Sequence, residues 1–274
     1  MSPSGPHSLC SVDGEIMLAS EAMIPAVDDG FVRGDGAFEV VRVHDGVPFA
    51  MDEHLARMER TGAGLRLPID LEAVRADAHR LLAHAAADSE HAEDHRLLRL
   101  IVTRGGHRVL ITERLPDAPE RLRLLSTTYA PTRVLDGLKS LSYAANMLAT
   151  RLAKEAGFDD ALLVTPHGRV LEAPTRAVFW VSGGELCTVP LSEPILASIT
   201  RAVVLGVCEV RERSITLEEL YAADEVFLAS TTREVHPVAA IDDHEYPETA
   251  PVTERTAERV MARVRERLLA AASE

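Results

Sequence analysis

The chain has 274 residues, 46% of them apolar, which is enough to bury a full core and longer than one average domain. Its formal net charge of −14 argues against nucleic acid or an anionic membrane surface as a partner, because both favour clustered Lys and Arg. Cys10, Cys187 and Cys208 are too scattered for a disulfide framework or a metal site. With no signal peptide and no long apolar run, we expect a cytoplasmic protein that acts on small molecules, without a membrane segment.

The first half of the chain predicts a compact α/β unit. Asp13-Gly14 and Asp45-Gly46 are typical of tight hairpin turns, and the apolar residues around them predict short strands. Apolar residues at helical spacing predict two helices, and two later apolar runs predict strands. In chain order these elements are hairpins at 11–17 and 37–49, helices at 52–65 and 70–88, and strands at 97–103 and 121–128.

The second half of the chain has a different pattern of predicted elements. A boundary is expected at 128–137, where Pro131 and Gly137 interrupt any regular element. Short strands separated by glycine-containing turns predict a mostly antiparallel sheet. The expected elements are a helix at 142–156, strands at 160–165, 169–172, 177–181 and 185–189, a helix at 195–211, a strand at 225–230 and a final helix around Val260.

These elements predict an α/β (α+β) fold in two domains. We expect a small N-terminal α/β domain at 1–128, a linker at 129–137, and a larger C-terminal domain at 138–274 that carries the mostly antiparallel sheet.

Lysine is scarce in this chain. Only Lys139 and Lys154 are lysines among the 29 basic residues, and arginine cannot act as a nucleophile at neutral pH because it keeps its proton. Lys154 falls in the last turn of an expected helix, where a solvated cation complements the helix dipole. Lys139 follows the expected boundary, so its amine would face a cleft between domains. By itself, however, Lys139 would be interpreted as a surface residue.

Six segments in order resemble fold type IV pyridoxal-phosphate enzymes, over about residues 12–240. The segments are GDGAFEVVRV at 34–43, HLAR at 54–57, LKSLSYAANMLA at 138–149, GRVLEAPTRAVFWV at 168–181, PILASITRAVV at 194–204 and FLASTTREVHPV at 227–238. That family includes branched-chain and D-amino-acid aminotransferases, (R)-amine transaminases and aminodeoxychorismate lyase. The resemblance implies a two-domain fold, pyridoxal 5'-phosphate as cofactor, no metal, and a homodimer whose active site lies at the subunit interface.

The resemblance also implies roles for individual residues. Lys139 matches the lysine that holds the cofactor covalently and moves a proton at the substrate α-carbon. Glu172 matches the carboxylate that pairs with the pyridine nitrogen, and Arg57 the arginine that binds the phosphate. Without the resemblance, both would be read as surface charges. The remaining expected cofactor contacts are Tyr143, Leu196, Ser198, Ile199, Thr200, Thr231 and Thr232.

Several of these contacts have a second interpretation. Ile199 and Thr200 match a helix start whose backbone amides bind phosphate, although Ser198 stands where glycine is common. Leu196 matches an apolar residue that packs on the cofactor ring, or else belongs to the core. Thr231 and Thr232 match a turn that donates hydrogen bonds to phosphate or to the substrate carboxylate, or else form an ordinary Ser/Thr turn.

Substrate choice is expected to depend on family positions around the pocket, namely Arg33, Phe38, Glu39, Arg104 and Arg108. Arg33 either binds a substrate carboxylate, at the site of the neighbouring subunit, or braces its own loop. Arg108 is followed by Val109 and Leu110, so it lacks the histidine of the Arg-x-His carboxylate trap common in D-amino-acid aminotransferases. Ala177 stands where many members have Asn.

Three functions fit these residues, and the first of them is the one that we predict. The first is transfer of an amino group from an amino acid, D-amino acids included, or from an (R)-primary amine to a 2-oxo acid. The second is aminodeoxychorismate lyase, because KSLSYAANM resembles some members with that role; Glu39 favours transamination slightly, since some lyases carry Thr there. The third is a non-catalytic binding homologue, against which intact Lys139, Glu172 and Arg57 argue.

Overall fold

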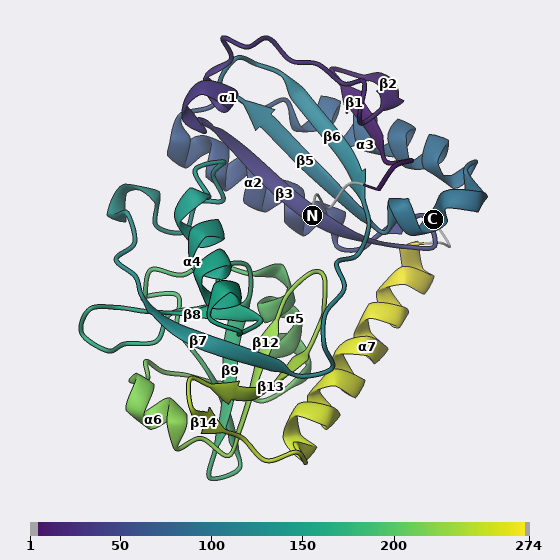
Figure 1. Cartoon of the computed structure of the whole chain (residues 1–274). Helices are drawn as coiled ribbons and strands as arrows, with labels where there is room; N and C mark the ends of the chain where they lie inside the picture. The colour runs from purple at the N-terminus through teal and green to yellow at the C-terminus, as the bar shows by residue number, and fades with distance from the viewer. Residues whose placement is uncertain (1–4, 272–274) are drawn as a thin grey trace. The chain divides into compact units, whose positions relative to one another are not determined.

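The computed structural model describes residues 5–271 and forms two compact units, drawn as a ribbon in Figure 1. Unit 1 comprises Met1–Asp117, Leu138–Ser142 and Glu266–Glu274, and unit 2 comprises Ala118–Gly137 and Tyr143–Arg265. The units differ from the expected domains in that residues 118–128 belong to unit 2, whereas 138–142 return to unit 1. This return follows from backbone pairing, because Ser140 forms an antiparallel bridge with Ala37.

Unit 1 is built on one antiparallel sheet of six strands, in the order β2-β1-β6-β5-β3-β4. Its apolar face packs into a core that includes Val41, Leu98 and Leu110, all fully buried. The strands are β1 (Leu9–Val12), β2 (Glu15–Leu18), β3 (Gly36–His44), β4 (Val47–Pro48), β5 (Leu97–Thr103) and β6 (Arg108–Glu113).

Two helices cover the apolar face of this sheet, behind β3, β5 and β6 in Figure 1. They are α2 (Met51–Leu65) and α3 (Leu71–Ala86), and Met58, Val74 and Leu81 supply fully buried side chains at helical spacing. Asp70 begins α3 by accepting a hydrogen bond from the backbone amide of Ala73 at 2.9 Å. The unit also contains the short helix α1 (Asp29–Arg33) and the 3₁₀ helix η1 (Ser89–His95).

Unit 2 is built on a mixed sheet in the order β11-β10-β9-β12-β13-β7-β8, with β14 paired to β13. The pairs from β10 to β13 are antiparallel, but β11 with β10, β13 with β7, and β7 with β8 are parallel. The strands are β7 (Leu122–Thr128), β8 (Asp160–Val164), β9 (Ala177–Ser182), β10 (Glu185–Thr188), β11 (Arg211–Glu212), β12 (Glu225–Ala229), β13 (His236–Ile241) and β14 (His244–Glu245).

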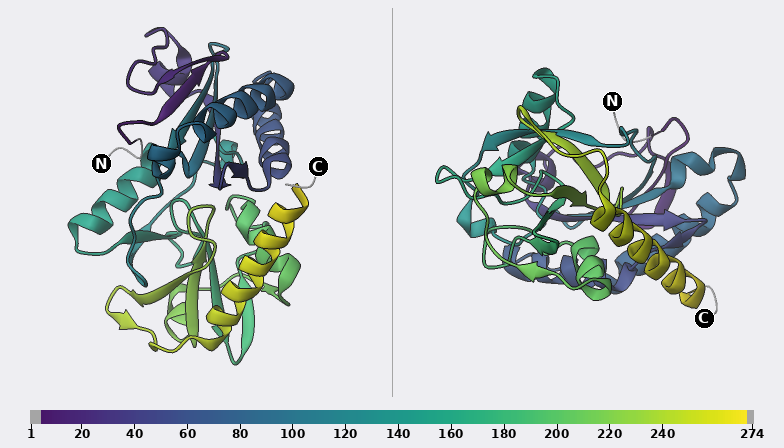
Figure 2. Two further views of the ribbon diagram at one scale, coloured as in Figure 1. Left: turned by 90° about the vertical axis from the view of Figure 1, so that its right-hand side faces the viewer. Right: turned by 90° about the horizontal axis from the view of Figure 1, so that it is seen from below.

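Helices cover this second sheet. Every residue of β8 and β12 is buried, as expected for strands whose two faces are both covered. Figure 2 shows α5 and the long helix α7 close together on one side of the sheet. The helices are η2 (Arg133–Leu135), α4 (Ala144–Glu155), α5 (Ile199–Val207), α6 (Leu217–Tyr221) and α7 (Pro251–Ala271), whose last residues belong to unit 1.

Several elements differ from the sequence-based expectation. The helix expected at 195–211 covers only Ile199–Val207, because Ser198 caps its start and Cys208 already has extended backbone. The strand expected at 169–172 forms only isolated bridges, at Val170 and Arg169. Strand β6 was not expected, although its sequence RVLITE is typical of a strand.

Candidate active site

The segment Leu138–Ser142 is bound to the edge of β3 by backbone hydrogen bonds. The amide of Phe38 donates to the carbonyl of Lys139 at 3.0 Å, and the amide of Leu141 donates to that of Gly36 at 2.9 Å. On the other side, the amide of Lys139 donates to Thr61 Oγ1 of α2 at 3.2 Å. The backbone of Lys139 is therefore held by both a strand and a helix of unit 1.

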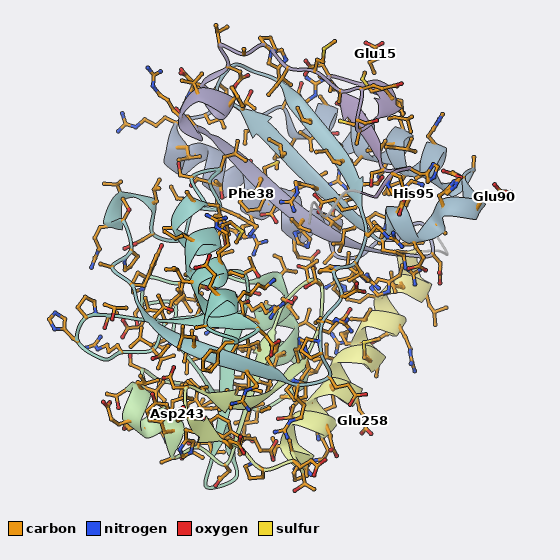
Figure 3. The ribbon with its side chains drawn as sticks, viewed as in Figure 1. Glu15, Phe38, Glu90, His95, Asp243 and Glu258 are labelled. Atoms are coloured by element: carbon orange, nitrogen blue, oxygen red, sulfur yellow. The ribbon has the colours of Figure 1, made fainter. Side chains whose placement is uncertain are left out.

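The two lysines have opposite environments. Lys139 is 8% exposed, and its Nζ lies 4.3 Å from the centre of the Phe38 ring, which Figure 3 labels on β3. Lys154 lies exposed in the last turn of α4. The buried lysine is thus the one that the motif singles out.

Glu39, Arg57 and His54 form a buried cluster between β3 and α2. Arg57 Nε and Nη2 donate to the two carboxylate oxygens of Glu39 at 2.7 and 2.6 Å, and His54 Nδ1 lies 2.8 Å from Glu39 Oε2. The three residues are 0–4% exposed. Burial raises the pKa of Glu39, but the hydrogen bonds from Arg57 and then His54 outweigh burial and lower it to about 2.

Burial lowers the pKa of His54 more than the hydrogen bond to Glu39 raises it, which favours the neutral imidazole. Because an ionised carboxylate can only accept hydrogen bonds, the His54 proton must sit on Nδ1. His54 was not among the expected site residues. The sequence feature that could have indicated His54 is its position three residues before Arg57, because this spacing puts both side chains on one face of α2.

In unit 2, Glu172 lies beside the segment that leads into α5. Both of its carboxylate oxygens lie 3.3 Å from the backbone amide of Leu196, which donates to them. The carbonyl of Glu172 accepts from Leu163 of β8 at 2.9 Å. Burial raises the pKa of Tyr129, and the nearby charges of Glu172 and Asp136 raise it further.

The start of α5 can bind an anion. Ser198 caps it by accepting from the amide of Arg201 at 3.2 Å. The amides of Ile199 and Thr200 stand in the first turn, where a helix offers no backbone acceptor of its own. Both residues are buried. The turn at Ser230–Arg233 is held by Ser230 Oγ, which lies 3.2 Å from Thr232 Oγ1 and accepts from the amide of Arg233.

Tyr143 precedes α4 and is half-buried. Its carbonyl accepts from the amide of Met147 at 3.0 Å. Tyr143, Leu196, Thr231 and Thr232 all belong to unit 2, as Glu172 does, whereas Lys139 and Arg57 belong to unit 1.

Two of the expected substrate arginines are engaged within unit 1. Arg104 donates to Asp35 Oδ2 at 3.0 Å and to the carbonyls of Leu65 and Arg66 at 2.8 and 2.7 Å. Arg108 Nε donates to Asp77 Oδ2 at 2.9 Å, and that aspartate is 2% exposed.

The third, Arg33, is 71% exposed and pairs only with Asp29 on its own helix among residues 5–271.

Within residues 5–271, no group of three or more His, Cys, Asp and Glu side chains is placed to hold a metal ion. Nor does any helix in this part of the chain combine the length and apolarity needed to cross a membrane.

Comparison with known proteins identifies the family of this chain. The class IV amino-transferase family model matches residues 36–241. A D-alanine aminotransferase of Bacillus licheniformis is 31% identical over 87% of this chain and 90% of that protein. A fold IV transaminase of Curtobacterium pusillum superposes with a TM-score of 0.79 at 29% identity, covering 93% of this chain and 99% of the other.

The 4-amino-4-deoxychorismate lyase of Pseudomonas aeruginosa is similar too, with a TM-score of 0.79, 30% identity, and coverage of 93% of this chain and 98% of the other. The two-domain α/β fold and the family expected from the sequence are thereby confirmed. The chain belongs to the class IV aminotransferases, a pyridoxal-phosphate-dependent family of fold type IV.

Proposed function

We propose that this enzyme transfers an amino group from an amino acid, D-amino acids included, or from an (R)-primary amine to a 2-oxo acid, with Lys139 as its catalytic residue. The observation that carries the proposal is the environment of Lys139, whose backbone is held by β3 and Thr61 and whose amine is buried over Phe38. The other lysine, Lys154, is exposed at a helix end.

The groups of this chain suit pyridoxal phosphate. They include a buried primary amine, a carboxylate beside a backbone amide, a buried arginine, and a helix start with amides that lack intrahelical acceptors. When bound, that cofactor supplies an aldehyde carbon that takes up amines and a ring that accepts the electron pair left by deprotonation.

Each residue then has a defined task. Lys139 Nζ takes the proton from the substrate α-carbon, at a site where burial keeps water away. Glu172 accepts the hydrogen bond of the ring nitrogen and balances its charge. Arg57 and the amides of Ile199 and Thr200 bind the phosphate. Ser198 would lie at the phosphate, Leu196 would pack on the ring, Tyr143 would be a further cofactor contact, and Thr231 and Thr232 would bind the phosphate or the substrate carboxylate.

Borohydride reduction followed by peptide mapping tests this assignment. The purified protein should be yellow, and reduction should fix the cofactor to the peptide that contains Lys139. Lys154→Arg is the matched control and should label as the unmodified protein does, whereas Lys139→Arg should not. Label on Lys154, or on neither lysine, would contradict the proposal.

The lyase reaction is the second candidate, because of the likeness to the Pseudomonas aeruginosa lyase. A panel of half-reactions separates the two. Transamination predicts that D-alanine, an (R)-amine or a branched L-amino acid converts the bound cofactor to its amine form, and that 2-oxoglutarate reverses the change. Formation of 4-aminobenzoate and pyruvate from aminodeoxychorismate, far faster than any such conversion, would favour the lyase.

For the substrate carboxylate we propose Arg33. Arg104 and Arg108 already donate to acceptors of unit 1, so binding a substrate would cost them these contacts. Arg33 is exposed and pairs with one exposed aspartate, which is a weak competitor.

The sequence motif implies that Arg33 acts in the site of a second copy of the chain. Exposed apolar side chains lie on the same segment, with Met23, Val27 and Phe31 between 70 and 86% exposed, which supports a homodimer through this face. Location in the cytoplasm stays a prediction from the sequence.

Co-expression of two inactive variants tests both ideas. If Arg33 serves the other subunit, an Arg33→Ala chain paired with a Lys139→Arg chain contains one complete site, and activity should return. If Arg33 serves its own subunit, the mixed dimer contains no complete site and should stay inactive. A monomer in light scattering would contradict the homodimer itself.

A further inference from the structure

Glu39 is placed differently from what its motif suggests. The sequence predicts a residue of the substrate pocket, but Glu39 is fully buried and both carboxylate oxygens accept hydrogen bonds from Arg57. One of these oxygens also accepts from His54. The carboxylate of Glu39 therefore binds neighbouring protein side chains.

We propose that Glu39 and His54 are positioning residues that hold the guanidinium of Arg57 in the orientation required to bind the cofactor phosphate. This inference rests on the phosphate-binding role proposed above for Arg57. Under this proposal Glu39 does not select the substrate, and His54 has a role that the sequence motif did not indicate.

The geometry of the pair explains why the orientation is fixed. A guanidinium is planar, and the edge formed by Nε and Nη2 faces Glu39 through two hydrogen bonds of 2.7 and 2.6 Å. Two bonds to one carboxylate prevent rotation about the last torsions of Arg57. The direction of the opposite edge, which carries Nη1, is thereby set before any ligand arrives.

Charge gives a second reason for this arrangement. A buried guanidinium without a counter-ion is strongly unfavourable, and Glu39 supplies that counter-ion within unit 1. His54 adds a hydrogen bond of 2.8 Å to Glu39, and burial favours the imidazole without charge. It therefore holds the rotamer of Glu39 while the Arg57–Glu39 pair stays balanced.

Comparing two forms of the cofactor isolates the effect on phosphate binding. Pyridoxal phosphate and unphosphorylated pyridoxal are titrated into the full chain after removal of the cofactor, and both dissociation constants are measured by absorbance. Loss of Arg57 orientation weakens binding of the phosphorylated form far more than binding of pyridoxal. General damage to the fold weakens both forms together.

Four variants and one control make the test specific. Glu39→Gln and Arg57→Gln should weaken pyridoxal phosphate by about 10- to 100-fold, as for a lost hydrogen bond to a charged group, and pyridoxal by about 3-fold at most. His54→Leu should show the same selectivity with a smaller loss, of about 3- to 30-fold. His54→Asn, whose amide nitrogen can replace Nδ1, should restore most of that loss.

Met58→Leu is the control, since it changes a buried apolar core side chain of the same helix that has no polar group to join the cluster. It should leave the ratio of the two constants unchanged.

Several outcomes would overturn the inference. Equal losses for both cofactor forms in Glu39→Gln and His54→Leu would show a merely structural role. His54→Asn as weak as His54→Leu would exclude the hydrogen-bond donor, and if Glu39→Gln does not fold, the two His54 variants decide alone. If Arg57→Gln keeps its preference for the phosphorylated form, the phosphate-binding role proposed for Arg57 is wrong. This outcome is distinct from a failure of the positioning proposal, which the Glu39 and His54 variants test.

Discussion

The amino group of Lys139 lies 4.3 Å from the centre of the Phe38 ring, and the backbones of the same two residues share a hydrogen bond of 3.0 Å. A change in the register between β3 and the segment 138–142 would therefore move the proposed catalytic amine.

Gly36→Ala should disturb Lys139 without touching it. A Cβ at Gly36 would lie 2.6 Å from both Leu141 Cδ1 and the carbonyl oxygen of Val102, and that oxygen belongs to the neighbouring strand. Because the backbone of β5 cannot move aside easily, we expect the segment 138–142 to shift. We expect kcat and the visible absorbance of the bound cofactor to differ from those of the unmodified protein, and both quantities are to be measured.

The matched control is Gly206→Ala on α5, where an added Cβ meets nothing within 4 Å. There we expect unchanged activity and a gain in stability of up to about 1 kcal/mol from helix propensity. Equal activity in the two variants would show that the register of β3 does not govern Lys139.

Arg108→Leu should cost stability and spare substrate affinity. It removes a donor from buried Asp77, which keeps one contact with Arg80, and we expect a loss of about 1–3 kcal/mol in the free energy of unfolding. Urea denaturation measures this loss, and KM for the 2-oxo acid should change by about 2-fold at most, since binding is proposed to depend on Arg33. A large rise in KM with unchanged stability would instead assign Arg108 to the substrate.

Glu225 caps the start of α7 and should matter for the stability of unit 2. Its carboxylate accepts from the amides of Val252 and Thr253 at 3.0 and 2.7 Å and from Thr253 Oγ1 at 2.8 Å. Glu225→Ala leaves these donors without an acceptor, and we expect a loss of about 1–3 kcal/mol in the free energy of unfolding. Glu258→Ala, on the exposed side of the same helix, should change it by less than about 0.5 kcal/mol.

The Glu39 cluster should stabilise the protein least in acid. The pKa of Glu39 is about 2 in the folded chain against an ordinary value of 4.5, so its stabilising effect is complete above 4.5 and is lost as pH falls towards 2. Thermal unfolding of the unmodified chain and of Glu39→Gln should therefore differ most at neutral pH. The difference should narrow between pH 4.5 and 2, and a constant difference would contradict an ionised Glu39.

The three thiols should differ in reactivity. Cys10 and Cys187 are at most 1% exposed, and burial raises the pKa of Cys10 to about 11, which disfavours its thiolate. Cys208 is half-buried and should react first with a small alkylating reagent at pH 8. Mass spectrometry of the labelled peptides gives the order. Early labelling of Cys10 would mean that unit 1 opens in solution at the β1–β6 pair.

Local features of the fold were predictable from the sequence. Helical spacing located α2 and α3 to within two residues at each end, because both helices present a regular apolar face. The helix around Ile199 was predicted too long at both ends, because apolar spacing does not reveal that Ser198 and Cys208 have extended backbone. Strand β6 was not predicted, although its sequence RVLITE is typical of a strand.

What the sequence determined by itself was chemistry: two lysines, one of them in a motif, and an order of segments that identified the family. What only the tertiary structure decided was which distant side chains and segments contact one another. Arg108 lies 31 residues from Asp77, and Lys139 returns to a strand that ends about a hundred positions earlier. Such pairs form because the folded core brings distant segments together, and neither spacing nor propensity along the chain encodes which charged side chains meet there.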